Sequence, residues 1–116
     1  MPLVLVRHKA DVPPGTLRVV VDALPAIVAS ALSTENNLDG TLRPGEIVVW
    51  VMEGSSLDAN TKPLEVVIFA NGYLERELSL GRRRRFIVDR LRQVAPVLCG
   101  RGYAWVLLAQ GSYEEL

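Results

Sequence analysis

The first candidate for chemistry stands at the very start of the chain. Pro2 follows Met1 directly, and the β-rich run Leu3 to Arg7 comes next. Small second residues usually allow the initiating methionine to be removed, and a trimmed chain would present Pro2 to a substrate as a free secondary amine. Proline is also an ordinary strand-initiating residue, so these two positions by themselves leave both interpretations open.

Two further side chains are candidates for the same site. His8 shares the strand face of Pro2 by simple alternation, which makes it a candidate acid or orienting group. The alternative for His8 is a strand-end histidine whose ring is satisfied by a backbone carbonyl. Trp50 stands in the middle of a predicted strand, where it would either line a pocket shared between subunits or pack in a core or an interface.

The elements that must position these residues form two similar β-α-β units. After the strand Leu3 to Arg7, the breaker DVPPG precedes a helix with Thr16 as its N-cap. Pro25 is expected to kink that helix or to end its first part. The residues NNLDG and the turn at Arg43 to Gly45 close it, and Glu46 to Met52 is the second predicted strand. The helix has one broad apolar face: Leu17, Val20, Val21, Leu24, Ile27, Val28 and Leu32.

The second unit repeats the first about sixty residues later. Leu64 to Ala70 is a predicted strand, a helix follows from about Leu80 to Val94, and Tyr103 to Ala109 is the fourth strand. We expect one domain over residues 1–116, with repeat one at about 2–53 and repeat two at about 63–110. Right-handed crossovers then make a four-stranded mixed sheet of the α/β (α+β) class, with two helices on one face.

The strands predict that the other face of this sheet is also buried. Apolar residues occupy successive positions in Ile47 to Val51, Val66 to Phe69 and Ala104 to Leu108, whereas a sheet with one wet face would alternate. Two helices cover only one face, so copies of the same chain in closed symmetry are expected to cover the other. Hydrophobic residues make up 49% of this short chain, which also favours an obligate oligomer.

Composition excludes several classes of partner and site. Thirteen basic and thirteen acidic residues balance, so no net positive field favours nucleic acid. The arginine run from Arg82 to Arg85 fans around a helix, with Glu75, Glu77 and Asp89 close enough to pair with it. It is interpreted as a solvated first turn, with or without one arginine that reaches an interface carboxylate. With one histidine and one cysteine, Cys99, a structural zinc site is not expected. A single cysteine also cannot form an internal disulfide, which favours a reducing compartment. No secretion signal or membrane-spanning run is present, and a cytoplasmic protein is expected.

The whole chain resembles the tautomerase superfamily, in particular its 5-carboxymethyl-2-hydroxymuconate isomerase-like branch. The resemblance rests on PLVLV after Met1, on LRPGEIVVWV, on VVIFANGYLERELSLGRRRRFIVDRL and on the closing YAWVLLAQGSYEEL. Members of that family are trimers whose amino-terminal proline is the catalytic base. The resemblance therefore implies a trimer, removal of Met1, and cofactor-independent chemistry at Pro2.

Arginines are the partners that such a base requires. Burial beside a cation lowers the pKa of an α-amino group below its usual ~7.7–8.0 and leaves a neutral base at working pH. The developing enolate and a substrate carboxylate both need cations. Arg43 lies where the resemblance places a substrate-binding arginine. Arg76 lies near the usual Gly-Arg-Ser-type turn, which this chain replaces with Gly72-Tyr73-Leu74-Glu75-Arg76, and Arg7 ranks third.

Two functions of different classes follow. The favoured one is an enzyme, a tautomerase or isomerase that moves a proton next to a carbonyl of a small carboxylated oxo or hydroxy-dienoate acid. A variant of it is a hydratase or decarboxylase in which protonated Pro2 acts as the acid. The alternative is a non-catalytic oligomer of the same fold that binds a ligand or a partner.

Overall fold

A computed structural model describes residues 2–36, 40–112 and 114–116. The strands are β1 (Leu3–His8), β2 (Val48–Glu53), β3 (Leu64–Asn71) and β4 (Gly102–Ala109). The helices are α1 (Pro14–Leu32), α2 (Leu74–Leu78) and α3 (Leu80–Val94), with short 3-10 turns η2 (Pro44–Glu46) and η3 (Pro96–Leu98). Two predictions fall outside these residues in whole or in part: the removal of Met1, and the breaker at 36–40.

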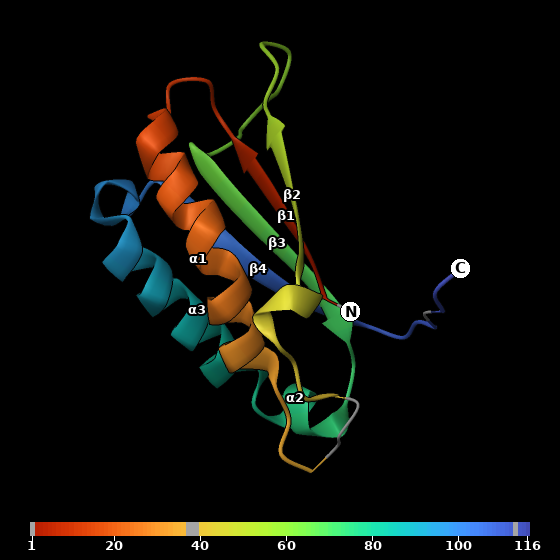
Figure 1. The fold of residues 1–116 in the computed structure, drawn as a ribbon. Coiled ribbons are helices and arrows are strands. Elements are labelled where there is room, and N and C mark those ends of the chain that lie inside the picture. The colour runs from red at the N-terminus through yellow and green to blue at the C-terminus, as the bar shows by residue number, and fades with distance from the viewer. Residues whose placement is uncertain (1, 37–39, 113) are drawn as a thin grey trace.

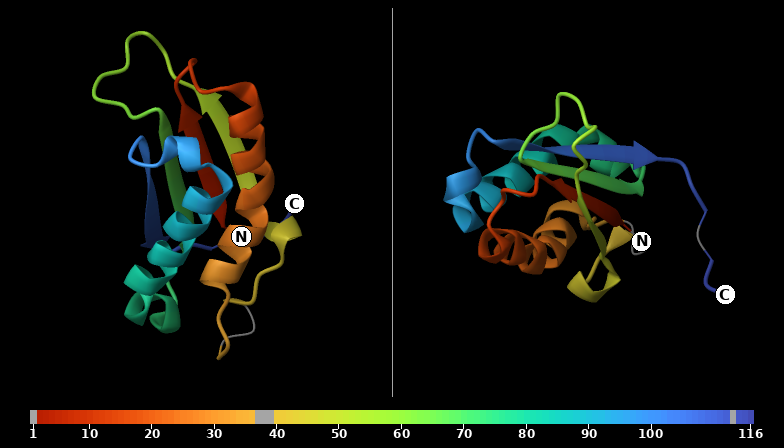
Figure 2. Two further views of the ribbon diagram at one scale, coloured as in Figure 1. Left: turned by 90° about the vertical axis from the view of Figure 1, so that its left-hand side faces the viewer. Right: turned by 90° about the horizontal axis from the view of Figure 1, so that it is seen from above.

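The sheet is mixed, in the order β2-β1-β3-β4. The predicted parallel pairs are confirmed, because β1 runs parallel to β2 and β3 runs parallel to β4. The two β-α-β units join through the antiparallel pair of β1 and β3 at the centre. Figure 1 shows α1 and α3 side by side over one face of this sheet, and the left view of Figure 2 looks onto that helix layer.

Helix α1 differs from its prediction at its start and at Pro25. It begins at Pro14, two residues before the predicted cap, because a proline fits the first helical position, where its missing N–H is not needed. It also runs on through Pro25 to Leu32. By length and apolar composition α1 resembles a membrane-spanning helix. Its buried side chains include Val20, Leu24 and Val28, which pack in the core against the sheet, as in the core helix of a globular fold.

The core lies between the helices and one face of the sheet. Val4 and Val6 of β1 and Val66 and Ile68 of β3 are fully buried there, and Ile87 of α3 packs with them. Side chains alternate across a strand, so the odd-numbered residues of β1 point to the opposite face. The predicted architecture, a four-stranded mixed sheet with two helices on one face, is therefore confirmed.

The opposite face, here called the open face, is covered by no helix in the part of the chain that the structure describes. The register aligns two apolar rows across all four strands and a third, mixed row at the end nearest His8. Trp50, Phe69 and Trp105 on this face are all substantially exposed. The members of the rows are Val48, Leu3, Phe69 and Leu107; Trp50, Leu5, Val67 and Trp105; and Met52, Arg7, Glu65 and Tyr103.

Candidate active site

Pro2 lies buried at the entrance to the central strand. Its carbonyl accepts a hydrogen bond from the amide of Val48, at 3.1 Å, so it is held against the start of β2. Leu3 pairs with Phe69 across the sheet, and the same register places Pro2 opposite Ala70 at the end of β3. Figure 1 shows these three strand ends together at the N-terminus. An amine in this apolar corner would be poorly solvated, and desolvation favours its neutral, basic form.

Arg43 is an exposed cation in the segment that leads into β2. It precedes η2 and stands five residues before Val48, the residue that holds Pro2. Its side chain is exposed and forms no hydrogen bond or ion pair with any residue that the structure describes. The position therefore has the property that the sequence prediction required, a guanidinium with its donors available to an anion.

Arg76 is used differently from the predicted substrate ligand. Only 2% of it is exposed, and its three nitrogens donate to three backbone carbonyls: Nε to Leu32 at 2.7 Å, one terminal nitrogen to Asn71 at 2.9 Å and the other to Gly40 at 3.2 Å. The guanidinium also lies over the ring of Tyr73, 4.8 Å from its centre. Burial lowers the pKa of Arg76 below its ordinary value. Because its donors are engaged within the fold, Arg76 is a poor candidate for holding a substrate directly.

A second buried arginine completes this arrangement. Arg83 donates to the carbonyls of Ala31 and Ser33, at 2.9 and 2.8 Å, and pairs with the Glu75 carboxylate at 3.3 Å. Helix α1 has no basic residue in its own last turn, so these arginines satisfy the carbonyls that every helix leaves free at its C-terminus. Glu75 accepts from the amides of Glu35 and Asn36, and these hydrogen bonds are the main cause of its lowered pKa.

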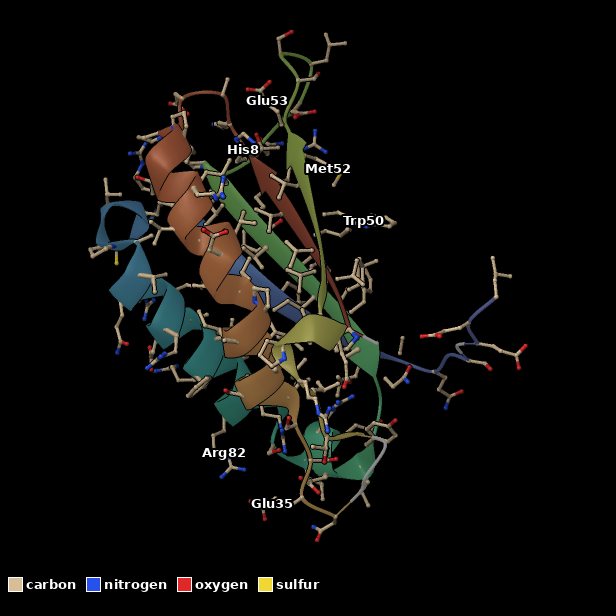
Figure 3. The ribbon with its side chains drawn as sticks, in the orientation of Figure 1. His8, Glu35, Trp50, Met52, Glu53 and Arg82 are labelled. Carbon is tan, nitrogen blue, oxygen red and sulfur yellow. The ribbon has the colours of Figure 1, made fainter. Side chains whose placement is uncertain are left out.

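His8 lies at the wrong end of β1 to assist Pro2 within one subunit. They are six positions apart, which is about 20 Å along a strand. Its Nδ1 is 2.9 Å from the carbonyl of Lys9, the outcome expected for a strand-end histidine. Figure 3 shows the imidazole at the end of the sheet remote from the N-terminus. Shared strand face was a correct inference, but it did not bring the two residues together.

Trp50 and Arg7 belong to the open face rather than to the side of the sheet on which the Pro2 ring lies. Trp50 is 56% exposed, and Figure 3 shows it and Met52 pointing away from the helices. The position of Trp50 on the open face favours packing in an interface over lining a pocket. Arg7 donates a hydrogen bond to the carboxylate of Asp58, in the connection from β2 to β3, and forms an ion pair with it. This hydrogen bond is the largest cause of the lowered pKa of Asp58.

The arginine run divides between two environments. Arg83 is buried, whereas Arg82, Arg84 and Arg85 are exposed and have no hydrogen-bond or ion-pair partner in the described part of the chain. Figure 3 shows Arg82 pointing into solvent. The solvated first turn was therefore predicted correctly for three of the four residues.

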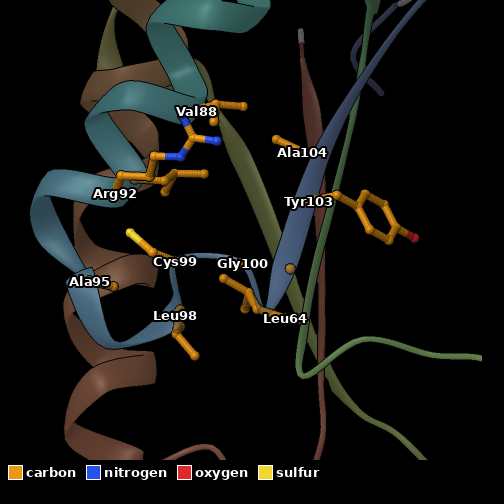
Figure 4. A pocket seen from close by; sticks show the side chains of 11 residues that line it. Leu64, Val88, Arg92, Ala95, Leu98, Cys99, Gly100, Tyr103 and Ala104 are labelled. Atoms are coloured by element: carbon orange, nitrogen blue, oxygen red, sulfur yellow. The ribbon is translucent and has the colours of Figure 1, made fainter.

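Two cavities lie beside the helices of the fold. An apolar cavity of about 120 Å³ lies between α3, η3 and the start of β4, with Leu64, Leu91, Arg92 and Cys99 among its lining residues (Figure 4). A polar hollow of about 500 Å³ lies between the end of α1 and the start of α3 and includes Arg82. Neither is lined by Pro2 or Arg43. A substrate at Pro2 would thus need a second wall that the described residues of one chain do not supply.

The expected pairing of Glu75 with the arginine run is found in its ion pair with Arg83, but sequence reasoning missed the burial of Arg83 and the amide partners of Glu75. The signal for Arg83 was available in the helical period, because Leu80, Arg83, Ile87 and Leu91 form one stripe. An arginine on the apolar stripe of a helix is expected to be buried and paired. Nothing comparable marks Glu75, whose partners are backbone amides forty residues earlier in the chain.

Comparison with known proteins identifies the fold. No protein-family model and no curated protein matches the sequence. Among solved structures, 5-carboxymethyl-2-hydroxymuconate delta-isomerase has a TM-score of 0.64 and 14% identity and covers 100% of this chain and 87% of its own. A fused 4-OT wild-type asymmetric trimer has a TM-score of 0.66 and 10% identity, with coverages of 98% and 91%.

A third structure, malonate semialdehyde decarboxylase, has a TM-score of 0.62 and 8% identity and covers 97% of this chain and 91% of its own. All three are tautomerase-superfamily proteins, and each similarity extends over nearly the whole of both chains. Identities this low are informative about architecture and leave the chemistry to be argued from the residues. The chain therefore has the tautomerase-superfamily fold, with a buried proline at the start of its central strand.

Proposed function

We propose that this chain is a cofactor-independent tautomerase or isomerase of small carboxylated oxo or hydroxy-dienoate acids, acting in the cytoplasm. The observation that carries the proposal is the position of Pro2, buried at the entrance to the central strand of a tautomerase fold. The free amine that acts as the base forms when Met1 is removed. A buried secondary amine with a lowered pKa is neutral near pH 7 and accepts a proton without help from a metal or a cofactor.

The chemistry then needs few groups. The Pro2 nitrogen takes a proton from the carbon next to the carbonyl of an oxo acid, or from the hydroxyl group of a hydroxy-dienoate. The electron pair moves into the conjugated enolate, and the proton returns to a different atom, which for a hydroxy-dienoate is a carbon of the conjugated system. Arg43 holds the substrate carboxylate, since its guanidinium is exposed and uncommitted. Arg76 is better suited to support the site than to bind the substrate, because its nitrogens donate to backbone carbonyls.

Oligomerisation supplies the missing wall of this site. The open face presents two rows of apolar side chains, and exposed apolar surface of this extent is typical of an interface. A fused 4-OT structure with this fold is a trimer. We therefore propose that three copies pack through their open faces and that the pocket at Pro2 is completed by a neighbouring subunit.

The decisive experiment combines intact mass with kinetics. The natural protein should lack the mass of Met1, and the trimmed protein should ketonise a 2-hydroxydienoate acid at a rate well above that of buffer. Pro2→Ala, which still presents a primary amine, should lose most of that rate and keep the oligomer. A protein that retains Met1 and gains no activity when Met1 is removed would contradict the proposal and favour the non-catalytic binding oligomer.

A second candidate reaction has support from one comparison. The malonate semialdehyde decarboxylase that shares this fold is described with decarboxylase and hydratase activities, and its solved forms include a proline-to-alanine variant at its first position. In a reaction of that kind the Pro2 nitrogen would be protonated and would act as an acid. The pH dependence separates the two candidates: kcat/KM of a base-catalysed tautomerase rises through the Pro2 pKa, whereas that of an acid-catalysed hydratase falls.

A further inference from the structure

Arg76 joins three segments that come from distant parts of the chain. Its nitrogens donate to the carbonyl of Leu32 at the end of α1, of Gly40 in the connection that leads to Arg43, and of Asn71 at the end of β3. The register of β1 and β3 places Asn71 just beyond the residue opposite Pro2. One buried side chain therefore ties the neighbourhood of the candidate base to the segment that carries the candidate anion ligand.

We propose that Arg76 is a positioning residue, which sets the geometry of Pro2 relative to the Arg43 connection without touching the substrate. A guanidinium is suited to this task because its planar, rigid donors aim at three acceptors at once, which a lysine ammonium on a flexible stem does not reproduce. The segment from 33 to 46 depends on such ties. Its amide at Thr34 donates to the Gly40 carbonyl, so the carbonyl that Arg76 holds also closes the base of this connection.

The local surroundings keep Arg76 in this role. Arg83 and Glu75 fix the end of α1 and residues 35 and 36 from the other side, and the Tyr73 ring covers the Arg76 guanidinium. Without Arg76, the carbonyls of Leu32, Gly40 and Asn71 would lose a charged donor, although the Gly40 carbonyl would keep the Thr34 amide. The connection carrying Arg43 would then be free to shift against Pro2, and a misplacement of about 1 Å at a catalytic centre lowers rates by about 100-fold.

Arg83 is the matched control that the chain itself provides. It is equally an α-helical arginine with low exposure that donates to the end of α1, at Ala31 and Ser33, but it donates to neither Gly40 nor Asn71. Arg83→Met and Arg76→Met should therefore lower thermal stability to a similar degree, whereas the Arg76 variant alone should disturb the Pro2 end of the sheet.

The first readout is independent of any activity. Amide hydrogen exchange is measured on the whole chain after removal of Met1. In Arg76→Met the exchange rate should rise at least ~10-fold at two amides, that of Val48, which donates to the Pro2 carbonyl, and that of Thr34. Arg83→Met should leave Val48 unchanged, and Val66 in mid-sheet should be unchanged in both variants. Equal exchange at Val48 in the two variants would overturn the inference. If Arg76→Met does not fold, Arg76→Lys, which keeps the charge, takes its place.

The second readout is kinetic and rests on the proposed function. Arg76→Met should lower kcat about 100-fold with KM changed less than about threefold, and Arg76→Lys should recover at least tenfold of that loss. If the parent is active and Arg76→Met has the same kcat, the positioning role is rejected and the proposed function stands. An inactive parent with the predicted exchange pattern would reject the proposed function and retain the structural role of Arg76.

Discussion

Replacing Trp105 by serine tests the interface most directly. Trp105 lies on β4 in the row of Trp50, Leu5 and Val67, and 57% of it is exposed. A tryptophan offers up to about 250 Å², so about 140 Å² remain to be covered by a neighbouring subunit. At about 25 cal/mol per Å² this burial is worth up to about 3.5 kcal/mol, which corresponds to association weakened up to about 300-fold.

Sedimentation at a series of concentrations from nanomolar to micromolar measures this effect. The parent protein should sediment as a trimer at micromolar concentration, and Trp105→Ser should dissociate at concentrations at which the parent does not. Val97 in η3 is the matched control, because 57% of it is also exposed but it stands on the helix side of the fold. Val97→Ser should associate like the parent. Equal dissociation curves for Trp105→Ser and the parent, or a parent that is monomeric throughout, would refute the role of the open face.

Three further predictions concern the site and its support. Enzymatic removal of Met1 should create or strongly raise tautomerase activity and leave anion binding little changed; equal rates for both forms would clear Pro2 of its role as the base. Arg43→Ala should raise KM at least ~10-fold for a carboxylated substrate and change KM little for the corresponding ester, so that a parallel loss for both would argue against a carboxylate ligand. The pKa of Glu75 is lowered from 4.5, mainly by the Glu35 and Asn36 amides, so its stabilisation is complete above pH 4.5 and is lost as the pH falls through the lower, folded-state pKa. Glu75→Gln should accordingly be less stable than the parent at pH 7 in urea unfolding, and the difference should shrink as the pH falls below 4.5; a difference independent of pH would contradict this assignment.

Most of the fold was accessible to sequence analysis, because hydrophobic periodicity reports local structure well. The helix predicted at about Leu80 to Val94 is found at those bounds, and each strand is found within two residues of its predicted ends. The short helix α2 was not predicted, since five residues are too few to show a period. The path of α1 through Pro25 was also beyond local reasoning, because tertiary packing of Leu24 and Val28 stabilises a turn that propensity disfavours.

The candidate site was less accessible, because it depends on contacts between distant segments. From their positions along the chain, Arg76 after the third strand and Arg43 before the second strand were both candidates to bind a substrate anion. The structure separates them: Arg76 is buried against carbonyls from residues 32, 40 and 71, while Arg43 stays exposed. Likewise, alternation correctly gave His8 the strand face of Pro2, but the length of β1 keeps the two far apart.

Properties that depend on near neighbours could be derived from the residues alone: the two β-α-β units, the parallel pairing within each, and a sheet with more apolar surface than two helices can cover. Which charges are buried and which are exposed depends on the folded chain, because burial is set by where the end of α1, the 40–46 connection and the end of β3 converge. A guanidinium in water and one surrounded by three carbonyls are the same letter in the sequence. Their environments differ, and the environment sets what each arginine is available to bind.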